Sequence, residues 1–140
     1  MKNTLKDCSL DHVAIAVSNL ENAIKVYEAI GLQFDSKREI VESQKVKTAF
    51  AHIDENAHIE LLEPTDESST IHQFIQKKGE GIHHLSFKVK DVFKKQKELE
   101  EKGMKFIYPA PTAGANNMMV NFIHPKSTGG VLIEISSKKN

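Results

Sequence analysis

The chain has 140 residues, which suits one compact domain with a sizeable buried core. Hydrophobic residues make up 39% and charged residues 27%, and 19 basic side chains balance 19 acidic ones. This balance argues against partners attracted by a strong overall charge, so we expect neither nucleic acid nor a membrane surface as a partner.

The N-terminus and the cysteine content indicate a cytoplasmic protein. Residues 1–10 are polar and of mixed charge, unlike a signal peptide. The longest apolar run, residues 13–17, is too short to cross a bilayer. The single cysteine, Cys8, cannot form an internal disulfide and is interpreted as an incidental thiol.

The first half of the chain predicts one strand, one helix and three further strands. Residues 12–17 predict the first strand, and Asn19 predicts a helix start because its side chain can accept a first-turn amide hydrogen. Gly31 stands where a left-handed residue would end this helix. Leu20, Ala23, Ile24 and Tyr27 have helical spacing between them, and strands are predicted at 34–41, 47–53 and 58–63.

The second half predicts the same order of elements after a linking helix over residues 68–79. A strand is predicted at 84–89, Asp91 is the expected cap of the next helix, and Gly103 its expected end. Residues 109–117 are rich in Pro, Gly and Asn and predict a loop. The remaining strands are predicted at 106–108, 118–124 and 131–136.

The two halves are an internal repeat with a constant offset of 72 positions, which relates His12 to His84. The same offset pairs Val17 with Val89, Lys25 with Lys97, Glu28 with Glu100, Gly31 with Gly103 and Phe34 with Phe106. The predicted fold is therefore α+β, with two tandem βαβββ modules in a single domain, residues 1–140. Module one covers about 8–64 and module two about 81–137.

Strand alternation selects one histidine from each module. In the first strand Val13, Ile15 and Val17 are expected to face the helix, and His12 the opposite side. In the second module both the alternation and the offset select His84, whereas His83 is expected on the helix side or at the strand's edge.

The last strand of each module carries a carboxylate among apolar residues, Glu60 in HIELLEP and Glu134 in VLIEISS. Their separation of 74 positions is explained by two extra residues in the turn before the final strand. A carboxylate in such a strand is costly unless something pairs with it. We therefore predict a divalent metal site made of His12, Glu60, His84 and Glu134.

Each of these side chains taken alone could be a structural or half-exposed residue, so the prediction depends on the symmetric set. Imidazole and carboxylate together suit zinc, cobalt, nickel, manganese or iron. His52 and His124 share the offset and are expected to have structural or outer-shell roles, and His58 is a competing ligand on the face of Glu60.

Four stretches carry a resemblance to a known family: LDHVAIAV, IELLEP, GEGIHHLSF and HPKSTGGVLIEI. Over residues 10–136 the chain resembles the methylmalonyl-CoA epimerase family of the vicinal oxygen chelate (glyoxalase/bleomycin resistance/dioxygenase) superfamily. The resemblance implies a glyoxalase-like, cupped mixed sheet around a metal site and a homodimer. It assigns the same four ligands, with cobalt expected first and zinc, nickel or manganese as alternatives. Some epimerases have glutamine in place of Glu60.

The implied activity is interconversion of (2R)- and (2S)-methylmalonyl-CoA, a CoA thioester, by α-proton abstraction and return through a metal-stabilised enolate. Glu134 is also the candidate acid/base. Lys126 and Ser127 are candidates to bind the substrate's carboxylate or a coenzyme phosphate, and the alternative is a tight turn with a solvated lysine.

The second acid/base group is left open by the sequence. Thr48 occupies a position where some family members have glutamate, and threonine cannot act as a base at neutral pH. Glu42, Glu63 and a water relayed by Thr48 are the alternatives.

Two other functions compete on the same scaffold. One is a glyoxalase I-type lactoylglutathione lyase, or an isomerase of a related thiol adduct, and GIHH and HPKSTGG argue against it. The other is a non-catalytic protein that sequesters a drug, which would not need two inward-facing glutamates paired with histidines.

Overall fold

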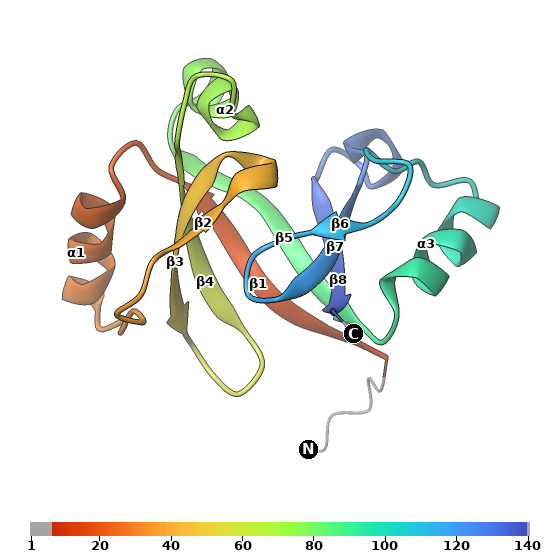
Figure 1. Cartoon of the computed structure of the whole chain (residues 1–140), viewed down its shortest axis with the longest axis horizontal. Coiled ribbons are helices and arrows are strands. Elements are labelled where there is room, and N and C mark those ends of the chain that lie inside the picture. The colour runs from red at the N-terminus through yellow and green to blue at the C-terminus, as the bar shows by residue number, and fades with distance from the viewer. Residues whose placement is uncertain (1–6, 140) are drawn as a thin grey trace. The chain divides into compact units, whose positions relative to one another are not determined.

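The computed structural model describes residues 7–139. These residues form eight strands and three helices, with two short 3₁₀ turns at Glu42–Gln44 and Pro125–Ser127 (Figure 1). In chain order the elements are β1 (Cys8–Ala16), α1 (Leu20–Ile30), β2 (Glu39–Val41), β3 (Val46–His52), β4 (His58–Pro64), α2 (Thr70–Lys78), β5 (Gly81–Val89), α3 (Val92–Glu101), β6 (Thr112–Ala113), β7 (Met118–Ile123) and β8 (Ile133–Lys138).

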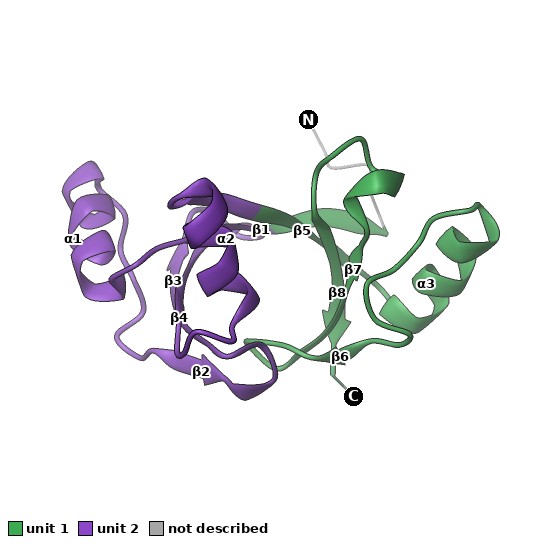
Figure 2. Cartoon of the chain, turned by 90° about the horizontal axis from the view of Figure 1, so that it is seen from above, with its two compact units in different colours: residues 1–11, 84–140 green, residues 12–83 purple. Residues whose placement is uncertain are grey.

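The described chain divides into two compact units (Figure 2). We call residues 12–83 the N-terminal unit, and residues 84–139 together with 7–11 the C-terminal unit. Each contains one of the two helices that directly follow a long strand, α1 in the first and α3 in the second. The predicted β-α-β-β-β order therefore appears in both halves.

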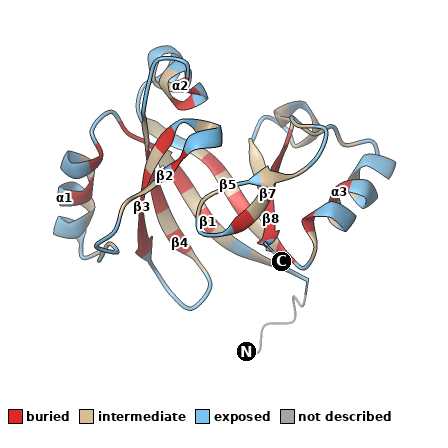
Figure 3. Ribbon diagram, viewed as in Figure 1, coloured by how far each residue is buried: buried red, intermediate tan, exposed pale blue. Residues whose placement is uncertain are grey.

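In the N-terminal unit the strand order is β2-β3-β4-β1. β1 is parallel to β4, and β3 is antiparallel to both β2 and β4. Helix α1 packs its apolar side on one face of this sheet, and its outer side is exposed (Figure 3). The buried contacts of this core are Val17, Leu20, Ile24, Ala49 and Leu61, with Ile15, Ala23, Tyr27, Phe34 and Ile59 packed against them.

The C-terminal unit repeats this arrangement with the strand order β5-β8-β7-β6. β5 is parallel to β8, and β7 is antiparallel to both β6 and β8. Helix α3 covers one face of the sheet. Its core consists of Val89, Val92, Ile123 and Ile135, with Leu99, Met104, Phe106, Met119 and Ile133 packed against them.

The predicted helix starts are confirmed. The Asn19 side chain accepts the backbone N–H of Asn22 at 2.9 Å, and Asp91 accepts those of Phe93 and Lys94 at 2.9 and 3.1 Å. Gly31 has φ 123° and follows α1 directly, a conformation that side chains with a β-carbon rarely adopt.

The strand predicted at 34–41 is wrong over most of its length. Phe34 makes an isolated bridge to Ala51, and regular pairing begins only at Glu39. Between them the Arg38 guanidinium donates to the Asp35 carbonyl at 2.6 Å, which holds this segment in a turn. Only the end of the predicted strand pairs with β3 as β2.

The segments around 106–113 and 131–136 also differ from the prediction. Phe106 makes only an isolated bridge to Ile123, and Tyr108 bonds instead to the Asn121 side chain, which receives its N–H at 3.3 Å. The two-residue strand β6 falls inside the predicted loop. The last strand begins at Ile133 rather than 131, because the carbonyl of Val131 accepts the Thr128 hydroxyl within a turn.

Cys8 is exposed at the beginning of β1. Of the helices formed by residues 7–139, none has the length and apolar character needed to cross a membrane.

Candidate metal centre

The N-terminal unit pairs His12 with Glu60 on the sheet face turned away from α1. Their neighbours Ile59 and Leu61 pack toward α1, so alternation directs Glu60 to the opposite face. The His12 Nε2 atom lies 3.6 Å from Glu60 Oε2. Both residues are buried, each with 6% of its surface exposed.

The C-terminal unit contains the equivalent pair, His84 on β5 and Glu134 on β8. His84 Nε2 lies 3.9 Å from Glu134 Oε1, and the residues are 3% and 5% exposed. The Phe122 ring meets His84 edge-on, with ring centres 5.1 Å apart. Ile133 and Ile135 pack toward α3, so Glu134 faces the other side of the sheet.

Both pairs have the chemistry of metal ligands, and their atoms lie slightly farther apart than two atoms bound to one ion. A direct N–H···O hydrogen bond measures about 2.7–3.2 Å, shorter than either separation. Two ligand atoms that each bind one ion at about 2.1 Å lie roughly 3.0–3.4 Å apart. The separations of 3.6 and 3.9 Å are closer to this second geometry. Because a buried carboxylate and an imidazole are suitable donors for a divalent transition metal, both pairs fit such an ion.

His83 has different surroundings from its neighbour His84. Its ring lies edge-on to Phe74 of α2, with ring centres 5.0 Å apart. Burial, helped by the charge of Lys78, lowers the pKa of His83 to about 4. His83 is therefore a neutral packing residue near neutral pH.

His58 remains a neighbour of the first pair, as the sequence suggested. Its ring centre lies 5.0 Å from that of His12, and the two residues are register partners between β1 and β4. His52 is exposed beside Asp35, with its Nε2 atom 3.5 Å from Oδ2. His124 caps a turn, since its Nδ1 accepts the N–H of Lys126 at 3.1 Å.

Comparison with known proteins identifies the family. The sequence profile of the "Glyoxalase/Bleomycin resistance protein/Dioxygenase superfamily" matches residues 11–122. The chain belongs to this superfamily.

Several superfamily relatives have the name that the sequence motifs suggested. The mitochondrial methylmalonyl-CoA epimerase of Dictyostelium discoideum is 38% identical over 92% of this chain and 78% of its own length. The crystal structure of methylmalonyl-CoA epimerase from Mycobacterium tuberculosis has a TM-score of 0.90 and 37% identity, covering 100% of this chain and 94% of that one.

A solved methylmalonyl-CoA epimerase in complex with methylmalonyl-CoA and NH4+ has a TM-score of 0.90 and 31% identity, covering 95% of this chain and 96% of that one. The glyoxalase-like fold and the resemblance to the methylmalonyl-CoA epimerase family are therefore confirmed. The expectation of an enzyme in that family is confirmed with them.

Lys126 and Ser127, the predicted substrate-binding residues of this superfamily member, lie in the 3₁₀ turn before β8. The Ser127 hydroxyl oxygen accepts the backbone N–H of Lys105 at 3.0 Å, so it already stabilises the loop. Lys126 is exposed. The turn forms as the structural alternative expected, and its lysine stays accessible to an anionic ligand.

Of the carboxylates considered for the second acid/base role, Glu63 lies away from the His12–Glu60 face. Glu63 accepts the backbone N–H of Leu20 at 2.8 Å and so stabilises the start of α1. Glu42 is exposed in a 3₁₀ turn. Thr48 is fully buried, and its hydroxyl donates to the carbonyl of Glu39 at 3.2 Å.

Sequence reasoning missed the residue directly opposite Thr48. Glu39 of β2 is the register partner of Thr48 of β3, and cross-strand partners share a sheet face. The spacing of Glu39 and Val41 is too short a pattern to assign a sheet face, and the strand predicted at 34–41 had no established register. Its faces could not be assigned without the pairing to β3.

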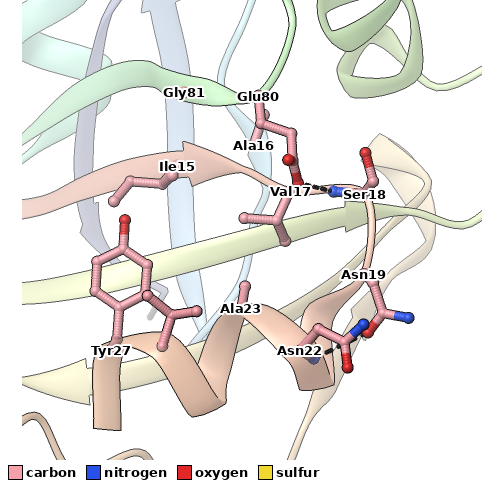
Figure 4. A pocket seen from close by; sticks show the side chains of 11 residues that line it. Ile15, Ala16, Val17, Ser18, Asn19, Asn22, Ala23, Tyr27, Glu80 and Gly81 are labelled. Carbon is pink, nitrogen blue, oxygen red and sulfur yellow. Dashed lines mark hydrogen bonds between the residues drawn. The ribbon is translucent and has the colours of Figure 1, made fainter. Parts of the chain in front are cut away.

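A pocket of about 480 Å³ lies elsewhere in the N-terminal unit, between the end of β1 and α1 (Figure 4). Its lining includes Ile15, Ala23, Tyr27 and Glu80, and none of the four predicted ligands. The Glu80 carboxylate accepts the N–H of Ser18 at 2.7 Å, which closes one end. This pocket lies beside the helix-facing residues of β1, on the side of the strand opposite to His12.

Proposed function

We propose that the chain is a methylmalonyl-CoA epimerase that interconverts the (2R) and (2S) forms of its substrate with a divalent metal ion. The observation that carries this proposal is the pair of buried His–Glu couples, one in each unit, with separations of 3.6 and 3.9 Å. The names of the relatives support the choice of substrate.

We assign His12, Glu60, His84 and Glu134 to one metal ion. Each unit alone offers two ligands in its couple, whereas zinc sites use at least three protein ligands. Two carboxylates would balance the charge of a divalent cation, and two neutral imidazoles would complete the set. Cobalt is the first candidate, with zinc, nickel and manganese as alternatives.

The bound ion would act as a Lewis acid toward the substrate oxygens that gain negative charge as the α-proton leaves. Glu134 is the acid/base residue of this chain for one face of the α-carbon. Its carboxylate, which is buried, takes the proton there. The exposed ammonium group of Lys126 would bind an anionic part of the substrate.

Two adjacent histidines test the ligand assignment. In His84→Gln we expect metal affinity to fall by more than the roughly 10–100-fold that loss of an outer hydrogen-bond partner costs. His83→Gln is the matched control and should retain the metal, because His83 packs on Phe74. Metal analysis of both proteins after dialysis measures this. Equal retention by the two variants would remove His84 from the site.

A glyoxalase I-type isomerase would use the same donor atoms, so the substrate needs its own test. We expect exchange of the methylmalonyl-CoA α-hydrogen and no turnover of methylglyoxal hemithioacetals. The opposite pattern would assign the chain to the isomerase class. A purified protein that takes up neither cobalt nor zinc would instead favour a drug-sequestering binder.

The proposal includes a single domain made of the two predicted modules, a cytoplasmic location and a homodimer. The homodimer is proposed from the resemblance to the epimerase family. Light scattering of the purified protein would give the mass of the assembly.

A further inference from the structure

Epimerisation requires two proton-transferring groups. A proton leaves one face of the α-carbon and another must arrive on the opposite face, or the configuration is not inverted. Glu134 of the C-terminal unit can serve one face. A carboxylate on a strand of the N-terminal unit is therefore needed to serve the other.

Three carboxylates lie on strands of residues 12–83: Glu39, Glu60 and Glu63. Glu63 is bound to the start of α1, and Glu60 is assigned as a metal ligand. The structure thus leaves Glu39. We propose that Glu39 is the second catalytic acid/base, an inference that rests on the proposed epimerase function.

Strand pairing places Glu39 on the same sheet face as Glu60. Glu39 pairs with Thr48 across β2 and β3, and Thr48 pairs with Leu62 across β3 and β4. Leu62 lies two residues after Glu60, so all four side chains share one face. That face carries His12 and is turned away from α1.

The burial pattern of β2 gives independent support for this direction. Ile40 is 56% exposed, whereas Val41 is 7% exposed and Glu39 is half-buried. Because neighbouring strand residues point to opposite sides, Glu39 shares the covered side with Val41. The Thr48 hydroxyl, which donates to the Glu39 carbonyl, fixes this strand pair.

The spacing leaves room for a substrate. Glu39 and Glu60 are two strands and two residues apart, which corresponds to about 12 Å between their α-carbons in a regular sheet. Both side chains extend from the same face. The Glu39 side chain and a small acyl group of the substrate together would span the distance to a reacting carbon bound near Glu60. The small Thr48 side chain between them, held against the backbone, does not block this space.

The proton balance is simple. In one direction the Glu134 carboxylate takes the α-proton, and the protonated Glu39 carboxyl gives its proton to the other face. In the reverse direction the Glu39 carboxylate is the base and the Glu134 carboxyl is the acid. No bond other than the C–H and O–H bonds forms or breaks. Proton exchange with solvent then restores the starting protonation of both carboxyl groups.

The test follows α-hydrogen exchange in deuterium oxide from each epimer separately. For Glu39→Gln we expect epimerisation to fall at least about 100-fold. Exchange without inversion should persist from the epimer whose hydrogen faces Glu134. In Glu134→Gln the persisting exchange should come from the other epimer. Glu39→Asp, which keeps a shortened carboxyl group, should retain partial epimerisation.

Glu28→Gln is the control, because this exposed glutamate lies on α1, which packs on the opposite face of the sheet, and its change should leave the rate unchanged. Metal content and thermal melting of each variant establish that the site and the fold are intact. Epimerisation by Glu39→Gln within about threefold of the unmodified protein would overturn the proposal, and so would loss of exchange from both epimers. Absence of any exchange in the unmodified protein would refute the epimerase function itself.

Discussion

At the scale of single side chains, Glu134 is assigned two roles, ligand and base. Removing its negative charge in Glu134→Gln should lower the epimerisation rate by about 10²–10⁴-fold while the chain still folds, because the amide can occupy the same space. Coupled assays and circular dichroism would measure the two effects. An active Glu134→Gln variant would exclude this residue as a base.

Ser86 lies on the same sheet face as His84 and gives a prediction about stability. It is fully buried on β5, and its hydroxyl has no hydrogen-bond partner among the described residues. Its counterpart in the first module, 72 positions earlier, is Ala14. Ser86→Ala should therefore raise the free energy of unfolding, by up to about 1–3 kcal/mol, because a buried unsatisfied group is removed. Urea unfolding measures it, and a clear loss of stability would mean that the hydroxyl makes a favourable contact.

The positions of the paired side chains within their units could be predicted from the sequence, whereas that of Glu39 could not. The period-two alternation of the apolar strands determines the faces of Glu60 and Glu134. A shift of the strand register by one residue would turn the apolar side chains away from the helix. Glu39 lies on a three-residue strand, too short for a readable alternation. Its face becomes known only through the pairing with Thr48.

At the scale of elements, the two helix caps differ in strength. Asp91 accepts two backbone N–H groups and brings a negative charge to the positive end of α3, whereas Asn19 accepts one and is neutral. Asp91→Ala should cost about 1–2 kcal/mol of stability and Asn19→Ala less. Thermal unfolding of the two variants measures this, and epimerase activity at 25 °C should not change. A larger loss in Asn19→Ala would contradict the ranking.

Side chains explain the wrongly predicted elements. Residues 106–108 look like a strand, yet the Asn121 amide donates to the Tyr108 carbonyl at 3.0 Å and to Gln96 at 2.8 Å. These side-chain hydrogen bonds take the place of the backbone hydrogen bonds that a neighbouring strand would make with residues 106–108. Single-sequence patterns carry no information about such long-range amide contacts, whereas local caps such as Asn19 are readable because donor and acceptor lie within one turn.

At the scale of the whole molecule, the repeat was the most informative pattern in the sequence. The offset that relates His12 to His84 also relates the two β-α-β-β-β units, and the solved epimerase from Mycobacterium tuberculosis matches the whole chain with a TM-score of 0.90. Duplication predicts the architecture, but it does not specify how the copies diverged. Ala14 and Ser86 occupy equivalent positions, so at this point one copy is apolar and the other is polar.

The most direct test of the central claim is solvent deuterium incorporation into methylmalonyl-CoA, with and without a chelator. We predict incorporation at the α-carbon by the metal-loaded protein, its loss after chelation and its return on addition of cobalt. Exchange that continues at the same rate in the chelated, metal-free protein would contradict the metal-dependent mechanism, and no exchange under either condition would contradict the epimerase assignment.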